Sequence, residues 1–335
     1  MGHQRTPIGF LTAYVPEELL HAAGFDPVFI FPRPEEGGKG RVHLPGFVCW
    51  IVTSALDQAL GGELDRLAGL VLAKTCDATQ GLADLWRRDV PHIPLFHFGM
   101  PSRLDGPAVK SYLAAELRDL RERIQAHTGR PITDDELRES ISWCNRQRAL
   151  VREAYAHIVT YSPPDFYAML RTMFESRCLA LPHSSPLPDA PRLILVGSAL
   201  GDVVLFEILE QVGARVVGDL FDLGARYFEA DAAEDGDPLE AIAQRLCTLI
   251  PTPTKYHSTK SRAQRLLEIV NTRQAAGVIF ARQKFCEPHG FDYVRLVRAL
   301  DEARVPHLLL ELEQASQTGQ LRTRVEAFIE VIGHV

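Results

Sequence analysis

Residues 67–86, LAGLVLAKTCDATQGLADLW, join an apolar run to an amphipathic stretch and decide the fold class of this chain. The first half predicts a buried strand and the second half a helix, with Cys76 and an acid at the junction. Residues 275–293, AAGVIFARQKFCEPHGFDY, repeat this arrangement around Cys286. Strands that lead directly into helices are typical of parallel sheets, and open α/β sheets place their chemistry at the carboxyl ends of such strands.

Strand and helix patterns alternate in two separate parts of the 335 residues. Strands are expected at 7–13, 26–31, 67–75 and 92–98, and again at 192–200, 214–220, 277–285 and 307–313. Between the two sets, the chain from Ser102 to about 180 contains only amphipathic helical patterns, and proline-rich LPHSSPLPDAP follows as a boundary. We therefore expect an α/β protein with a first lobe at 1–101, a helical insertion at 102–182 and a second lobe at 190–335.

Composition excludes several classes of protein. A hydrophobic content of 46% and a charged content of 24% are those of an ordinary globular protein with a sizeable core. The formal charge of −7 comes with no basic run, so we expect no nucleic-acid partner. The sequence contains no apolar segment of membrane-spanning length and no signal-peptide pattern, which predicts a cytoplasmic protein without a membrane partner.

Six cysteines in a reducing compartment favour metal binding, catalysis or packing over disulfides. Three lie inside helical patterns and are expected to pack as small hydrophobes: Cys144, Cys178 and Cys247. The other three, Cys49, Cys76 and Cys286, have strand-end or loop settings, and they could meet in a cleft between the lobes. Three core cysteines, or a zinc site completed by His289, are the alternatives. A cubane cluster normally takes four thiolates, so three would leave one iron open to another ligand.

Four stretches of the sequence resemble one known family and occur in the same order as in that family. They read YVPEELLHAAGFDPV, KTCDATQGLADLWRR, KFCEPHGFDYVRLVRALDEARVPHLLLELE and GQLRTRVEAFIEVI, and they span nearly the whole chain. The family is that of the iron–sulfur subunits of 2-hydroxyacyl-CoA dehydratases and benzoyl-CoA reductases. The match leans toward the small subunit of the benzoyl-CoA reductase type. Several motifs in register are more specific than one short pattern.

The resemblance implies two flavodoxin-like parallel-sheet lobes with a helical region between them and an iron–sulfur cluster at their interface. It implies that Cys49, Cys76 and Cys286 ligate this cluster, either a [4Fe-4S] cubane or a double cubane. It also implies an acyl-CoA substrate, a homologous second subunit or a self-dimer, and a separate ATP-hydrolysing iron–sulfur activator. The chain has no GxxxxGK[ST] loop of its own, which agrees with an outside activator.

Three functions remain open at the level of the sequence. The first is a catalytic subunit of an oxygen-sensitive acyl-CoA dehydratase or reductase, which passes single electrons at low potential to a CoA thioester. The second is a homodimer with a double-cubane cluster that reduces small molecules. The third is a supporting subunit whose own cluster relays electrons or is absent.

Three further residues are candidates for catalysis. Glu18 matches the second acid of the family's PxEL pattern and could order substrate or move protons, although an acid is also an ordinary start to a helix. Ser198 follows a predicted strand and could face the cleft or cap the next helix. His257 lies with Lys255 and Tyr256 in a loop that could handle protons or bind the thioester, or could simply face solvent.

Overall fold

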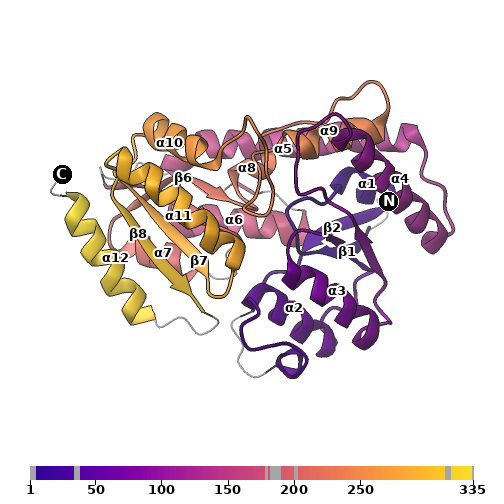
Figure 1. The fold of residues 1–335 in the computed structure, drawn as a ribbon, viewed down its shortest axis with the longest axis horizontal. Coiled ribbons are helices and arrows are strands. Elements are labelled where there is room, and N and C mark those ends of the chain that lie inside the picture. The colour runs from indigo at the N-terminus through magenta and orange to yellow at the C-terminus, as the bar shows by residue number, and fades with distance from the viewer. Residues whose placement is uncertain are drawn as a thin grey trace.

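The computed structural model describes residues 5–33, 38–177, 180–181, 190–199, 203–313 and 318–333. Two four-stranded parallel sheets lie side by side with helices packed on both faces of each (Figure 1). The first sheet has the order β2-β1-β3-β4, with strands at Phe25–Phe29, Thr6–Phe10, Leu70–Ala73 and Leu95–Phe98. The second has the order β6-β5-β7-β8, with strands at Arg215–Phe221, Arg192–Gly197, Gly277–Gln283 and His307–Leu312.

Both sheets follow the same 2-1-3-4 strand order, counted within each lobe, and this is the order of flavodoxin-like proteins. The predicted fold of two flavodoxin-like lobes is therefore confirmed. In such a sheet the chain reverses its winding between the first and third strands, here β1 and β3 or β5 and β7. Ligands bind beyond the carboxyl ends of these strands. The two reversal points of this chain are thus the expected edges of a functional site.

The helices alternate with the strands in each lobe and form a separate block between the lobes. The first lobe contains α1 (Glu17–Ala22), α2 (Trp50–Leu60) and α3 (Asp77–Asp89), together with the 3₁₀ turn Lys39–Val42. The block contains α4 (Val109–Thr128), α5 (Asp134–Ala156), the 3₁₀ turn Ile158–Thr160 and α6 (Pro163–Ser176). The second lobe contains α7 (Val204–Gln211), α8 (Ala225–Phe228), α9 (Pro238–Thr248), α10 (Arg262–Arg273), α11 (Glu287–Glu302) and α12 (Thr318–Gly333).

Alternating side chains place β3 between two apolar layers. Leu70 and Leu72 pack with α2 and α3, whereas Val71 and Ala73 face the opposite side and join the core around the helical block. That second core is continuous from the first sheet through α6 to the inner face of the second sheet. The helical block therefore joins the two sheets and sets how their carboxyl ends face one another.

One segment of the second lobe crosses back to the first. Helix α9 lies along α4 and near α1 (Figure 1), and the loop after it is bonded to the first half of the chain. The Thr252 backbone N–H donates to the Tyr14 hydroxyl (2.9 Å), and the Tyr256 N–H donates to the Ser102 carbonyl (2.8 Å). This crossover ties the lobes together beside the carboxyl ends of their strands.

Candidate functional site

A cavity of about 100 Å³ lies between the carboxyl ends of the two sheets. One water needs roughly 10–15 Å³ by this measure, so the cavity has room for a larger group. Its walls come from both lobes and include Leu11, Thr12, Cys49, Thr75, Cys76, Thr79, Ser198, Asp222, Thr252, Thr254, Gln283, Cys286 and His289. Leu11 and Thr12 follow β1, Thr75 and Cys76 follow β3, Ser198 follows β5, and Gln283 ends β7. The cavity therefore lies at both reversal points of the sheets.

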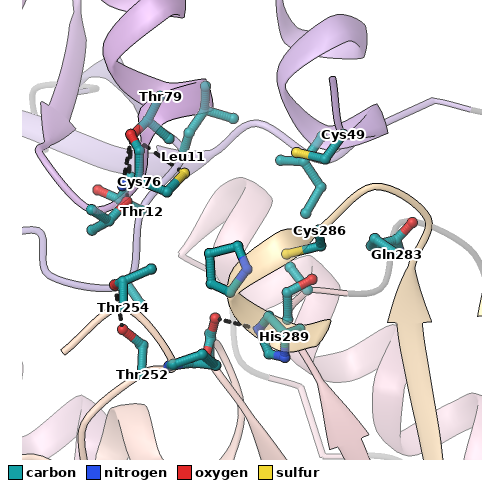
Figure 2. Close-up of a pocket in the computed structure, with 18 of the residues that line it drawn as sticks. Leu11, Thr12, Cys49, Cys76, Thr79, Thr252, Thr254, Gln283, Cys286 and His289 are labelled. Atoms are coloured by element: carbon teal, nitrogen blue, oxygen red, sulfur yellow. Dashed lines mark hydrogen bonds and ion pairs between the residues drawn. The ribbon is translucent and has the colours of Figure 1, made fainter. Parts of the chain in front are cut away.

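All three cysteines singled out from the sequence line this cavity. Figure 2 shows their sulfur atoms turned toward the same central space, Cys49 and Cys76 from the first lobe and Cys286 from the second. Each is the N-cap of a helix, at the starts of α2, α3 and α11. The positive end of a helix dipole favours negative charge, so all three positions suit a thiolate or an anionic group.

Burial and the neighbouring cysteines raise the pKa values of the Cys49 and Cys286 thiols. Burial raises the pKa of Cys49 to about 11, with the nearby charge of Cys76 adding to the rise and the Val52 and Ile51 backbone N–H groups opposing it. Burial and the charge of Cys49 raise the pKa of Cys286 to about 12, against a hydrogen bond from the His289 N–H. Both thiols are thus protonated at neutral pH until a cation replaces their protons.

The donor set suits a cluster better than a single ion. Among the described residues, no group of three or more His, Cys, Asp or Glu side chains converges closely enough to hold one metal ion. A zinc ion would need sulfur and nitrogen donors at about 2.0–2.3 Å from one centre. In a cubane each thiolate binds a different iron, so the three sulfurs stand around the group without meeting at a point. His289 is engaged elsewhere, with its Nε2 atom 3.0 Å from Asp222 Oδ2.

The other cysteines have different surroundings. Cys144 in α5 and Cys247 in α9 are buried, 1% and 6% exposed, and neither lines the cavity. Burial raises the pKa of the Cys247 thiol to about 11 without any charged neighbour contributing. Cys178 lies outside the described residues. Two of the three cysteines expected to be packing residues are therefore buried in helices, as predicted.

Polar side chains of the second lobe form the wall opposite Cys76. Burial would raise the pKa of Asp222, but His289 and the guanidinium groups of Arg262 and Arg226 hold it below its ordinary value. Asp222 is therefore a carboxylate and can only accept, so His289 Nε2 carries the proton that it donates. Ser198 lines the same wall, and its buried hydroxyl has no hydrogen-bond partner among the described residues. Ser198 was predicted from the sequence as a site residue, whereas Asp222 was not.

The family of the chain is shown by a match to one family model. The family model of 2-hydroxyglutaryl-CoA dehydratase, D-component, matches residues 12–332, nearly the whole chain. The chain belongs to this family. The resemblance that the four sequence stretches indicated is thereby confirmed.

Curated relatives of this dehydratase-family chain are themselves subunits. It is 28% identical to the (R)-phenyllactyl-CoA dehydratase beta subunit of Clostridium sporogenes, a match that covers 97% of this chain and 91% of that protein. It is also 28% identical to one of the benzoyl-CoA reductase subunits of Thauera aromatica, over 98% of this chain and 91% of that protein. It is 24% identical to the lactoyl-CoA dehydratase subunit beta of Anaerotignum propionicum, over 97% and 91%. The relatives thus include subunits of dehydratases and of a reductase.

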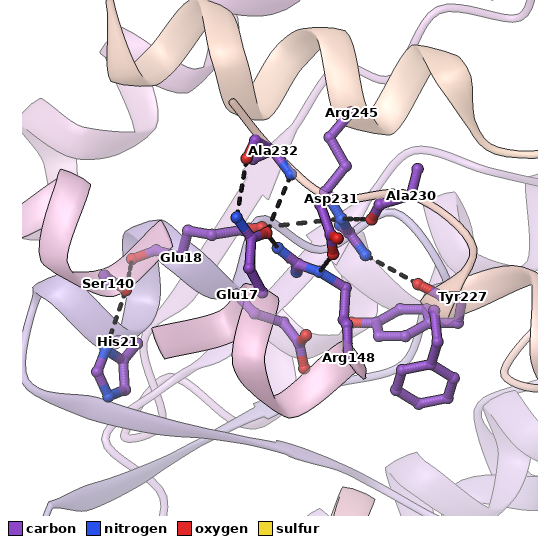
Figure 3. A network of polar contacts seen from close by, with 12 residues as sticks. Glu17, Glu18, His21, Ser140, Arg148, Tyr227, Ala230, Asp231, Ala232 and Arg245 are labelled. Carbon is purple, nitrogen blue, oxygen red and sulfur yellow. Dashed lines mark hydrogen bonds and ion pairs between the residues drawn. The ribbon is translucent and has the colours of Figure 1, made fainter. Parts of the chain in front are cut away.

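Glu18 of this family member lies in a buried ion-pair network and does not line the cavity. It is fully buried, and its Oε1 atom accepts from Arg148 Nη1 at 2.8 Å and lies 3.8 Å from Arg245 (Figure 3). Burial would raise the pKa of Glu18, but the two guanidinium groups hold it below its ordinary value. Burial, and then Arg148, lower the pKa of Arg245, whereas Glu18, Cys144 and Glu17 together outweigh burial and raise the pKa of Arg148. With its 2.8 Å contact, Arg148 is the main partner of Glu18. The network joins α1, α5 and α9.

His257 also lies away from the cavity. Its Nδ1 atom is 3.2 Å from the Thr259 backbone nitrogen, in a loop whose neighbour Ser258 donates its N–H to Asp105. Lys255 of the same loop turns inward and donates to the carbonyls of Lys74 and Met100 at 3.0 and 2.9 Å. Burial lowers the pKa of Lys255 to about 8. The loop thus holds the strand ends of the first lobe, and a catalytic role of His257 stays a prediction.

His21 in α1 should make the protein less stable in mild acid. Burial first, and then Arg5 and Arg177, lower its pKa to about 4. Its Nδ1–H donates to Ser140 Oγ (2.9 Å), whose own hydroxyl donates to the Glu18 carbonyl, and its ring stacks on Trp143. The unfolded chain binds a proton near pH 6.5 and the folded one only near 4. Stability is therefore complete above pH 6.5 and is lost as pH falls toward 4.

The loss should reach no more than about 2 kcal/mol, because His21 is partly exposed. Urea unfolding at pH 7 and pH 5 measures it, with His21→Phe retaining a ring against Trp143 and removing the titration. His92→Phe, at an exposed histidine paired with Asp65, is the matched control. The same pH dependence in both variants would contradict the assignment to His21.

Among the described residues, none of the helices combines the length and apolar character required to span a membrane.

Proposed function

We propose that this chain is the iron–sulfur subunit of an acyl-CoA dehydratase or reductase, with Cys49, Cys76 and Cys286 as the ligands of a [4Fe-4S] cluster. One observation carries the proposal: three cysteines far apart in the sequence, each at a helix N-terminus, line a single cavity between the lobes. The two other described cysteines do not line it. Soft thiolate donors are those that iron–sulfur clusters prefer.

When bound, such a cluster supplies low-potential single electrons and one iron position open to an oxygen ligand. The protein contributes orientation and exclusion of water. Thr252 and Lys255 hold the crossing loop against the first lobe, which fixes one wall of the cavity. Asp222 and His289 form a fixed polar pair on the second-lobe wall, where a bound thioester can be oriented.

The partners follow from the relatives and from the sequence. The relatives are named as subunits of dehydratases and a reductase, which supports a homologous second subunit for this chain. The sequence has no phosphate-binding GxxxxGK[ST] loop, which supports a separate ATP-hydrolysing iron–sulfur protein as the electron donor. A low-potential cluster needs reducing surroundings, so we place the complex in the cytoplasm. The substrate class is an acyl-CoA thioester.

Anaerobic purification with a co-expressed partner subunit tests the cluster directly. We expect about four iron and four sulfide per chain, no zinc, and an EPR signal after reduction with dithionite. About eight iron and eight sulfide per chain would contradict the single cubane in favour of a double one. Zinc in place of iron, or no metal after anaerobic handling and reconstitution, would overturn the proposal.

A further inference from the structure

Gln283 is a buried glutamine whose side-chain amide has no partner in the described part of the chain. It is the last residue of β7 and is only 2% exposed, yet neither its Oε1 nor its Nε2 atom hydrogen-bonds to any described residue. The backbone around it is well anchored, because Gln283 pairs with Leu312 of β8 and its carbonyl accepts from the Cys286 N–H. The side chain lines the cavity beside Cys286 (Figure 2).

Gln58 is a buried glutamine with a purely structural role, and its side chain is hydrogen-bonded within the protein. It lies in α2 of the first lobe, is 6% exposed, and donates from Nε2 to the Phe31 carbonyl (2.9 Å) and to Ser54 Oγ (3.3 Å). Buried polar groups are nearly always paired, because an unpaired one loses its hydrogen bonds to water without replacement. Gln283 therefore lowers the stability of the ligand-free protein, and a ligand in the cavity can supply the missing bonds.

Two more unpaired atoms lie on the same wall. Within the described part of the chain, neither Ser198 Oγ nor Asp222 Oδ1 has a hydrogen bond, and Arg262 Nη1 stays 3.9 Å from that Asp222 oxygen. Ser198, Asp222 and Gln283 follow or end β5, β6 and β7, so three neighbouring strands present them together. The wall therefore offers two acceptors, Asp222 Oδ1 and Gln283 Oε1, along with a hydroxyl and an amide N–H that can donate.

We propose that Gln283 is a positioning residue that recognises the hydroxyl group of a 2-hydroxyacyl thioester. Its Oε1 atom accepts from the substrate hydroxyl while its Nε2 atom donates to an oxygen of the same ligand, and Asp222 Oδ1 is a second acceptor in the same cavity. A benzoyl thioester offers only a carbonyl acceptor next to its ring and would leave both acceptors unpaired. The inference rests on the proposed acyl-CoA function and narrows it to dehydration of 2-hydroxyacyl substrates.

The test compares thioesters that differ only in the hydroxyl group. The anaerobically purified complex, without activator and ATP, is titrated calorimetrically with lactoyl-CoA against propionyl-CoA, and with phenyllactyl-CoA against 3-phenylpropionyl-CoA. A site built to bond a hydroxyl rejects the analogue that lacks it, because its buried groups are then left unpaired. We expect at least one of the two hydroxyacyl thioesters to bind about tenfold or more tightly than its analogue, and Gln283→Met to reduce this preference below about threefold.

Stability separates recognition from a structural role. Gln283→Met should retain its iron and should not lower the thermal midpoint of the ligand-free complex, because no protein hydrogen bond is lost. Gln58→Met, the matched control, should lower that midpoint and keep the hydroxyl preference, because it leaves the Phe31 carbonyl unpaired. A Gln283→Met variant that keeps the preference, or that loses stability as Gln58→Met does, would overturn the inference.

Water or hydroxide in the cavity presents the same O–H group as the substrate, and the EPR spectrum distinguishes the two. If Gln283 bonds such a water, Gln283→Met changes the signal of the ligand-free reduced protein and leaves the thioester preference intact, which contradicts the substrate assignment. Absence of iron together with no binding of any thioester would instead show that the proposed function has failed. Normal iron content and equal binding of the hydroxy and deoxy thioesters would refute only the role of Gln283.

Discussion

Replacement of Cys76 by serine is expected to remove most of the iron from the anaerobically purified protein, and serine at Cys49 or Cys286 should do the same. Each thiolate holds a different iron of the cluster, so loss of one of three leaves the group attached at only two corners. The serine hydroxyl is a harder and far weaker donor for iron than a thiolate. Iron and sulfide are measured per folded chain after gel filtration.

Cys247→Ser and Cys144→Ser are the matched controls, because both cysteines are buried in helices and neither lines the cavity. Their iron content should equal that of the unchanged protein, whatever they lose in stability. Equal iron in all five variants would refute the ligand assignment. Loss of iron from the controls alone would show that the cluster binds outside the cavity between the lobes.

Arg148→Met should lower the free energy of unfolding by about 3–5 kcal/mol, because the fully buried carboxylate of Glu18 then keeps, among the described residues, just the longer 3.8 Å contact with Arg245. Methionine retains the helix preference and the apolar volume of α5. Arg138→Met, on the same helix, breaks an exposed pair with Asp135 and should cost no more than about 1 kcal/mol. Urea unfolding of the three proteins at pH 7 measures both differences.

A double variant, Glu18→Gln with Arg148→Met, shows whether the charge itself is responsible. The double variant still contains buried Arg245, which loses the charge of Glu18, so the comparison is a cycle with the single variants Glu18→Gln and Arg148→Met. Because Glu18 and Arg148 interact directly, the double variant should lose less free energy of unfolding than the two single variants lose together. If Arg148→Met unfolds like Arg138→Met, or if the losses of the two single variants simply add in the double variant, the buried pair does not hold α1 against α5 as the structure indicates.

The order of strands and helices could be predicted almost entirely from the sequence. Runs such as LAGLVLAKT and GVIFARQKF are apolar on both faces, and only a strand covered by helices on both sides buries such a run. The cap of α5 is local in the same way: Thr133 accepts from the Glu136 N–H, and the Glu136 side chain accepts from the Thr133 N–H. These features depend on neighbours in the chain, which the sequence displays directly.

The positions of the cysteines could be partly predicted for the same reason. Cys76 and Cys286 lie between the end of a strand and the start of a helix. In a parallel sheet, the carboxyl ends of the strands lie along one edge, so these cysteines are expected on the same side. Cys49 does not follow a strand directly; its setting outside the helical patterns made it a candidate, and the family resemblance implied that it is a ligand. The structure places it as the N-cap of α2, which packs on the same face of the first sheet as α3. Its role as a ligand, like those of the other two, stays a prediction until iron is measured.

The sequence by itself determined the elements, the two-lobe architecture and the family of this chain, because side-chain periodicity and short motifs are local properties. Only the tertiary structure decided that Glu18 lies in a buried ion pair and that His257 lies outside the cavity. It also decided that Gln283 lines the cavity with an amide that no described residue bonds. Each of these depends on groups far away in the chain, such as Arg148 for Glu18. Charge pairing and hydrogen bonding act over a few ångströms in space, and sequence distance says nothing about such proximity.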